Sequence, residues 1–165
     1  MRVLVANEQR MQPNRFEDGR PMLLGGLRQY HAFTAAAPGI AAQWRRFESH
    51  ELAGQAGSSR FGVMCGADHA GFEYMCAVEV ESLESLPEGA GRMRVPPQHY
   101  AVFVHERATQ SLGAVWQAIF AWLGSSDYES AHKPDFEVYS AGVEPLAASG
   151  SIEIWIGVVP RARGA

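Results

Sequence analysis

Residues 134–140 alternate between hydrophobic and polar side chains, which is the pattern typical of a β-strand. Phe136 and Val138 fall on one face of this predicted strand. The other face carries Asp135, Glu137 and Tyr139. The pattern therefore presents a carboxylate, Glu137, in the middle of a strand and beside an aromatic residue.

Residues 151–159 show the same alternation and predict a second strand. One face carries isoleucines and Val158, and the other carries Glu153, Trp155 and Gly157. If the two strands pair with their polar faces together, Glu137 and Tyr139 share a surface with Glu153 and Trp155. We expect this surface to form the floor of a groove suited to an apolar cation.

The periodicity of the remaining chain predicts the order strand, helix, strand, strand, which occurs twice. In the first half the strands cover residues 21–33, 60–65 and 72–80, and the helix covers residues 35–52. In the second half a strand at residues 98–105 and a helix at residues 111–123 precede the two strands described above. Glycine, proline and polar residues predict loops at residues 12–19, 54–59, 82–94 and 124–133.

This repeated order predicts a single domain, residues 1–165, built from two related halves. An N-terminal arm, residues 1–20, precedes the first repeat at residues 21–81, and a linker, residues 82–94, leads to the second repeat at residues 95–160. Trp44 and Phe61 in the first half correspond to Trp116 and Phe136 in the second. Glu137 corresponds to Gly62, so the acid breaks the symmetry of the repeat.

Composition and charge narrow the classes of partner. Of the 165 residues, 47% are hydrophobic and 19% are charged, which is typical of a globular domain. The net charge of −4 argues against binding to nucleic-acid phosphates, and the residues before the first strand are too few for a helix-turn-helix. No signal peptide or membrane-spanning segment is evident, so we expect a cytoplasmic protein with no direct nucleic-acid or membrane partner.

Motifs for cofactor or metal chemistry do not occur in the sequence. The six histidines lack metal-ligand spacing, and no nucleophile elbow, phosphate loop or dinucleotide fingerprint is present, so we expect no cofactor and no metal. Cys65 and Cys76 are predicted to be free thiols in a reducing compartment.

Four segments of the second half together resemble a known family. They are Val95-Pro96-Pro97 leading into Tyr100–His105, the helix with Trp116 and Trp122, Pro134–Tyr139, and Ile152–Val158. In this order they resemble the GyrI-like small-molecule-binding domain, which is also the effector-binding domain of AraC-type and other multidrug-sensing regulators. In the first half, the resemblance rests on the element order, Trp44 and the strand with Glu73. The sequence departs from the family pattern at Glu106-Arg107-Ala108 and at Gly157.

The resemblance implies an α+β fold in which two pseudo-symmetric β-α-β-β repeats form a curved antiparallel sheet. The helices would pack on one side of the sheet, and a ligand groove would lie on the other. Glu137 corresponds to the acid that meets cationic aromatic ligands in several members of the family. Together with the strand patterns, this predicts a ligand site formed by Glu137, Tyr139, Trp155, Trp116, Tyr100, Tyr30 and Glu153.

Three functions remain open. The first is a stand-alone effector-binding or drug-binding protein that takes up lipophilic cationic aromatic molecules, with Glu137 as the countercharge. The second is a hydrolase of reactive electrophilic small molecules in the same groove, where Glu137 would act with Tyr139 or Tyr100. The third is a protein-interaction module of the gyrase-inhibitor type. Binding is favoured over catalysis, and a homodimer or a protein partner stays open.

Overall fold

We describe residues 11–48 and 54–162 from a computed structural model of the chain. The strands are β1 (Arg15–Gly19), β2 (Met22–Ala32), β3 (Gln55–Ala67), β4 (Gly71–Val80), β5 (Gly91–Val95), β6 (Gln98–Glu106), β7 (Tyr128–Ser130), β8 (Asp135–Tyr139) and β9 (Ser151–Pro160). The helices are α1 (Ala36–Glu48), which follows a short 3₁₀ turn, η1 (Phe33–Ala35), and α2 (Leu112–Ser125).

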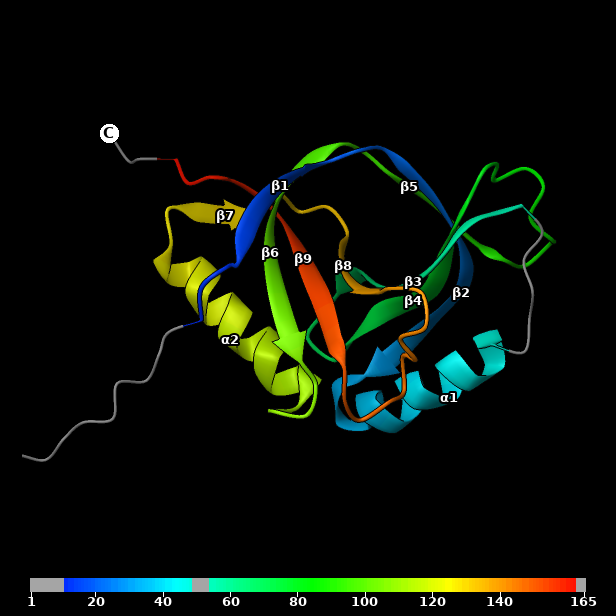
Figure 1. Ribbon diagram of the computed structural model, residues 1–165, viewed down its shortest axis with the longest axis horizontal. Helices are drawn as coiled ribbons and strands as arrows, with labels where there is room; N and C mark the ends of the chain where they lie inside the picture. Colours follow the sequence, from blue (N-terminus) through cyan, green and yellow to red (C-terminus); the bar gives the residue numbers. More distant parts are fainter. Residues whose placement is uncertain (1–10, 49–53, 163–165) are drawn as a thin grey trace, which may run out of the picture.

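The strands form one strongly curved antiparallel sheet in the order β1-β6-β9-β8-β3-β4-β2-β5, with β7 added at β9. The two halves of the chain meet where β8 pairs with β3, and four strands of this order lie on each side of that boundary. Both helices lie on one side of the sheet, whereas β1 and β5 curve across the other side (Figure 1). The predicted α+β fold with two related halves is therefore confirmed.

β1 and β5 were expected to be loop, within the arm at residues 1–20 and the linker at residues 82–94, and this expectation is wrong. Each strand leads into the first strand of one half but pairs with the first strand of the other half. β1 precedes β2 and pairs with β6, while β5 precedes β6 and pairs with β2. Their short, charged sequences carry a weak hydrophobic signal, and partners distant in the chain stabilise them as strands.

The registers of these exchanged strands define the repeat. Gly19 lies opposite Gln98 in the β1–β6 pair, and Met22 lies opposite Val95 in the β2–β5 pair. Both pairs follow from one alignment of the two halves, in which Met22 corresponds to Gln98 and Gly19 corresponds to Val95. The pseudo-symmetry therefore extends to β1 and β5.

Other boundaries differ less from the expected ones. β3 begins at Gln55, within a segment expected to be loop, and β7 forms inside the loop expected at residues 124–133. Helix α1 begins at Ala36, and its expected end at residue 52 lies outside the described residues. Ser111 caps α2, because its hydroxyl accepts a hydrogen bond from the Ala114 amide.

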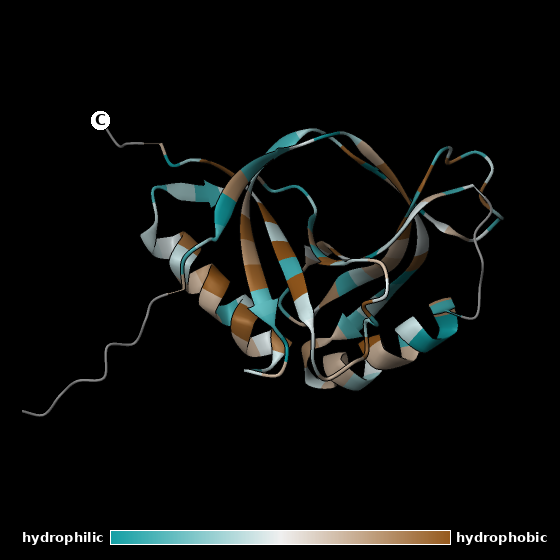
Figure 2. Cartoon of the chain, viewed as in Figure 1, coloured by the Kyte–Doolittle hydropathy of each residue, from teal (hydrophilic) through white to brown (hydrophobic). Residues whose placement is uncertain are grey.

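The core has a layer on each side of the sheet. On the helix side, Trp44 and Phe47 of α1 pack over β4, and Ile119 and Trp122 of α2 pack over β6 and β9. On the opposite side, a separate cluster includes Phe61, Met75, Val102 and Phe136. Hydrophobic and hydrophilic residues alternate along β9 (Figure 2), because one face of the strand packs in the helix-side core and the other carries Glu153, Trp155 and Gly157. None of the described helices is long and apolar enough to cross a membrane.

Candidate functional site

The Glu137 side chain is buried on the helix side of the sheet, with only 2% of the residue exposed. The expectation that this acid lies in a groove on the side opposite the helices is therefore wrong. Both carboxylate oxygens accept hydrogen bonds. The hydroxyls of Tyr74 and Tyr139 donate to Oε1 at 2.7 Å and 3.0 Å. The indole Nε1 of Trp116 donates to Oε2 at 3.0 Å. The carboxylate is therefore held by three aromatic side chains from β4, β8 and α2.

A second tryptophan, Trp44 of α1, completes the enclosure. Its indole Nε1 donates to the Tyr74 hydroxyl at 3.2 Å. Its ring stands edge-on to the ring of Tyr139, with the centroids 5.6 Å apart. Both helices thus contribute a tryptophan, and Glu137 lies between them. We call Glu137, Tyr74, Tyr139, Trp116 and Trp44 the glutamate cluster.

Gly62 of β3 provides the space that Glu137 occupies. The two residues lie opposite each other in the β3–β8 pair, and they also correspond in the internal repeat. A Cβ atom on residue 62 would overlap the Tyr74 hydroxyl and Glu137 Oε1. The acid in one half of the protein therefore depends on the missing side chain at the equivalent position of the other half.

Two opposing effects act on the ionisation of Glu137. Burial raises the pKa of the carboxyl above its ordinary value, while the hydrogen bonds from Trp116, Tyr74 and Tyr139 and the charge of Arg107 act to lower it. The Arg107 guanidinium lies 5.6 Å from the centroid of the Tyr139 ring. Burial has the larger effect and disfavours the ionised form. A positive charge that reaches the cluster would favour the ionised form.

Arg107 also fastens the loop between β8 and β9. Its guanidinium donates to the backbone carbonyls of Glu144, Pro145, Ser149 and Gly150. The same side chain therefore links residues 140–150 to the edge of the glutamate cluster.

The structure divides the predicted site residues between two faces. Tyr139 and Trp116 contact Glu137, as described above. Trp155 lies opposite Phe136 in the β8–β9 pair, whereas Glu137 lies opposite Ile154. The expectation that Trp155 and Glu153 share the face of Glu137 and Tyr139 is therefore wrong. The alternation shows which residues of one strand share a face, but not how the neighbouring strand is aligned.

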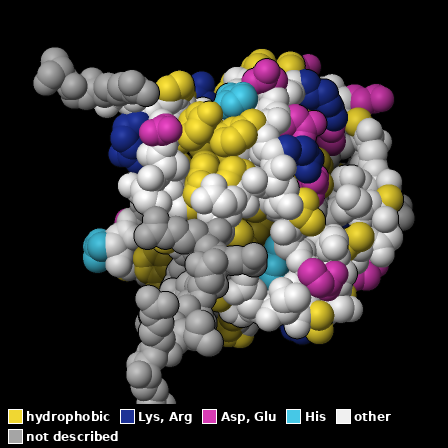
Figure 3. Space-filling model, turned by 60° about the vertical axis from the view of Figure 1, so that its left-hand side comes forward, with side chains coloured by type: hydrophobic (Ala, Val, Ile, Leu, Met, Phe, Trp, Pro, Cys, Tyr) yellow, Lys and Arg dark blue, Asp and Glu magenta, His cyan; other side chains and the backbone are white. Residues whose placement is uncertain are grey.

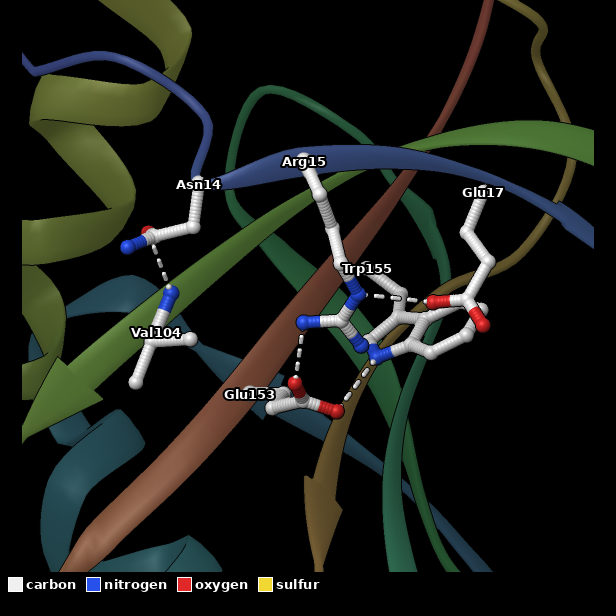
Figure 4. A network of polar contacts seen from close by, with 6 residues as sticks. All are labelled: Asn14, Arg15, Glu17, Val104, Glu153 and Trp155. Atoms are coloured by element: carbon white, nitrogen blue, oxygen red, sulfur yellow. Dashed lines mark hydrogen bonds and ion pairs between the residues drawn. The ribbon is translucent and has the colours of Figure 1, made fainter.

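Trp155, Tyr100 and Glu153 belong to the side of the sheet crossed by β1. The Arg15 guanidinium lies 5.7 Å from the Trp155 ring centroid and forms ion pairs with Glu153 and Glu17 (Figure 4). A cavity of about 350 Å³ on this side is lined by Tyr100 and Trp155 and by residues of β1, β2, β3 and β8.

Tyr30, the remaining predicted residue, takes part in neither arrangement. It is 48% exposed, and its hydroxyl donates to Asp68 in the turn between β3 and β4. A larger cleft, of about 1030 Å³, lies between α2, β7 and residues 11–16. Hydrophobic side chains gather on this face of the molecule (Figure 3). None of the seven predicted site residues lines this cleft.

The roles of Tyr74, Trp44 and Arg107 were not predicted from the sequence. Trp44 was assigned to the buried stripe of its helix, which is correct but does not reveal the contact with Tyr74. The sequence feature that could have indicated Tyr74 is its position on a predicted strand next to the one that carries Gly62, the residue that corresponds to Glu137. Among the described residues, no group of three or more His, Cys, Asp or Glu side chains could hold a metal ion.

Comparison with known proteins identifies relatives. The family model of the integron-associated effector binding protein, Cass2, matches residues 28–158. The transcriptional regulator BrlR of Pseudomonas aeruginosa is 30% identical, over 75% of this chain and 48% of its own length. The chain thus spans about half the length of this relative.

Solved structures share the fold at low identity. SAV2435, solved bound to tetraphenylphosphonium, aligns with a TM-score of 0.67 and 18% identity, covering 90% of this chain and 94% of its own. The Vibrio cholerae integron cassette protein VCH_CASS2 aligns with a TM-score of 0.62 and 18% identity, covering 88% and 95%. The EcmrR C-terminal domain aligns with a TM-score of 0.66 and 11% identity, covering 89% and 97%. With its GyrI-like fold and a family match over most of its length, the chain belongs to the Cass2 family of integron-associated effector binding proteins.

Proposed function

We propose that this protein binds a lipophilic, cationic aromatic small molecule, with Glu137 as the countercharge. The observation that carries the proposal is a buried carboxyl enclosed by two tryptophans and two tyrosines, one tryptophan from each helix. Aromatic faces attract large apolar cations, and a carboxylate supplies the opposite charge. The family to which the chain belongs supports the binding of a small-molecule effector.

Because Glu137 is buried, the affinity of the site should depend strongly on the charge of the ligand. The desolvated Glu137 carboxyl holds its proton more strongly than an exposed one, because burial disfavours the charged form more than the hydrogen bonds and the charge of Arg107 favour it. A cation beside it would replace the missing solvation and favour the ionised carboxylate. Each ring face that contacts the cation would contribute about 0.5 to 2 kcal/mol in addition. A neutral ligand of the same shape would gain neither effect.

The ligand's approach is expected at Trp116. This residue is 9% exposed, compared with 1% for Trp44 and 2% for Tyr74 and Tyr139. Outside it lies the ring of Phe120, which is 53% exposed and 5.8 Å from the Trp116 ring. A ligand entering here would displace the Trp116 indole from Glu137 Oε2 and take its place beside the carboxylate.

The structure of SAV2435 bound to tetraphenylphosphonium supports the choice of ligand class, since that protein shares the fold. Tetraphenylphosphonium is therefore the first probe, and triphenylphosphine oxide is its uncharged counterpart. Calorimetric titration of the parent protein should show binding of the cation and much weaker binding of the oxide.

The variant that tests the countercharge is Glu137→Gln. Loss of the charge should weaken tetraphenylphosphonium binding about 10-fold to 100-fold, because a charged contact is worth about 1.5 to 3 kcal/mol. The matched control is Glu73→Gln, which removes an exposed acid that is paired with Arg28, and it should bind like the parent. Equal affinity of Glu137→Gln and the parent for the cation would refute the proposal. Chromatography of the recovered ligand tests hydrolysis in the same samples.

The indole resonances of the four tryptophans locate the ligand. In a ¹H–¹⁵N spectrum assigned with single Trp→Phe variants, tetraphenylphosphonium should shift the Trp116 indole signal most. The reason is that this N–H donates to Glu137 in the unliganded protein. A cation that shifts only the Trp155 signal would place the site on the wrong face of the sheet.

A further inference from the structure

Four aromatic rings form a trough on the side of the sheet opposite the glutamate cluster. The stacked pair of Phe136 and Trp155 forms its floor, with the two rings nearly parallel, at 19°, and their centroids 5.8 Å apart. Tyr100 stands at 64° to Phe136 and at 67° to Trp155, and forms one wall. Phe61 stands at 77° to Phe136, with centroids 5.7 Å apart, and forms the other wall. The adjoining cavity has a volume of about 350 Å³.

The exchanged strand β1 closes the cavity from above. Residues 17–20 line it together with Met22. Gly19 lies directly against Tyr100, and a Cβ atom at this position would overlap the tyrosine ring. The glycine therefore permits the close approach of β1 to the aromatic wall. The cavity exists only because β1, from the first half, pairs with β6, from the second.

The charged side chains that line the cavity already have partners of opposite charge or hydrogen-bonding partners. Glu17 pairs with Arg15 at 2.8 Å, and Arg20 pairs with Glu79. The third, Asp18, lies 2.7 Å from His99. The walls and floor are aromatic or aliphatic, so a charged ligand in the trough would lose solvation without gaining a free countercharge.

We propose that this trough is a second small-molecule site, which takes an uncharged, planar aromatic ligand. A flat ring system can pack against the stacked pair of Phe136 and Trp155 and also meet the rings of Tyr100 and Phe61, which stand at steep angles to that pair. The volume falls at the lower end of the range of small-molecule pockets, about 300 to 1,000 Å³. The site is separate from the glutamate cluster, because Phe136 and Glu137 are consecutive residues of β8 that point to opposite faces of the sheet.

Acridone and 10-methylacridinium test the inference as a matched pair, since they share a planar tricyclic frame and differ in charge. Acridone should shift the indole signal of Trp155 and leave that of Trp116 in place. The methylacridinium ion should leave the Trp155 signal in place. The result that overturns the inference is an acridone titration with no shift at Trp155, or equal shifts at Trp155 from both compounds.

Two substitutions at Val138, which is half-buried and lines the cavity, add an affinity test. Val138→Phe fills the trough and should weaken acridone binding about 10-fold or more, whereas the matched Val138→Ala keeps the space and should still bind. Equal affinity of Val138→Phe and the parent for acridone would overturn the second site. An unchanged Trp116 indole signal confirms that each Val138 variant is folded.

Discussion

Gly62→Ala is the substitution that most directly tests the buried position of Glu137. The added methyl group would overlap the Tyr74 hydroxyl and Glu137 Oε1, and it would lie 2.8 Å from Tyr74 Cζ. The Tyr74 ring is 2% exposed and packed in the core, so it has little room to move. The Glu137 carboxylate is the more mobile group, and its movement breaks the 2.7 Å hydrogen bond from Tyr74.

The expected loss of stability combines two contributions that share one cause. Inserting a methyl group into a packed core typically costs about 1 to 3 kcal/mol, and a hydrogen bond to a charged group is worth about 1.5 to 3 kcal/mol. Because the same displacement produces both, they are not simply additive. We therefore expect Gly62→Ala to lower the free energy of unfolding by about 2 to 4 kcal/mol.

Gly57→Ala is the matched control, because Gly57 lies in the same strand and a Cβ atom added there would have no atom within 4 Å outside its chain neighbours. It should change the free energy of unfolding by less than about 0.5 kcal/mol. Urea unfolding at pH 7, followed by tryptophan fluorescence and circular dichroism, should show a midpoint about 1 to 2 M lower for Gly62→Ala. Equal midpoints for the two variants would refute the placement of Glu137 against Gly62.

Three further predictions concern groups outside that contact. Burial raises the pKa of Asp135 to about 7, so the folded state binds more protons than the unfolded chain, and the free energy of unfolding falls as the pH rises from about 4 to about 7. In urea unfolding, the parent should therefore be more stable at pH 5 than at pH 8 as far as Asp135 is concerned, and Asp135→Asn should reduce this difference in stability between the two pH values. Arg107→Ala should speed amide hydrogen exchange in residues 140–150, and Arg107→Lys should not restore full protection, because lysine cannot donate to all four carbonyls. Gln43→Leu should lower the free energy of unfolding by about 2 to 4 kcal/mol, since the fully buried Gln43 amide donates to two backbone carbonyls; an unchanged urea midpoint would contradict this.

The elements that could be predicted from the sequence are those with a strong local pattern. Trp44 and Phe47 follow helical spacing, and both are buried in α1. The strand with Glu137 shows clear alternation and forms β8. β1 could not be predicted in this way, because Phe16 is its one large hydrophobic residue and is 40% exposed. Its partner, β6, belongs to the other half of the chain.

The candidate site could be predicted only in part, for the same reason. Glu137 was identified as the unsymmetrical acid of the repeat, and its correspondence to Gly62 becomes a direct contact across β8 and β3. The hydrogen bond from Tyr74 joins residues 63 positions apart, and no local pattern reports it. Three residues assigned to the same site, Trp155, Tyr100 and Glu153, lie on the opposite face.

The sequence by itself determined the alternation within each strand, the two related halves and the acid, Glu137, that breaks their symmetry. Only the tertiary structure decided which faces of neighbouring strands coincide. A shift of one residue in the pairing of β8 with β9 would have placed Trp155 beside Glu137; the observed register places it beside Phe136. Alternation is a property of one strand, whereas register depends on the packing of the whole sheet. That difference turned one expected groove into a buried glutamate cluster on one face and an aromatic trough on the other.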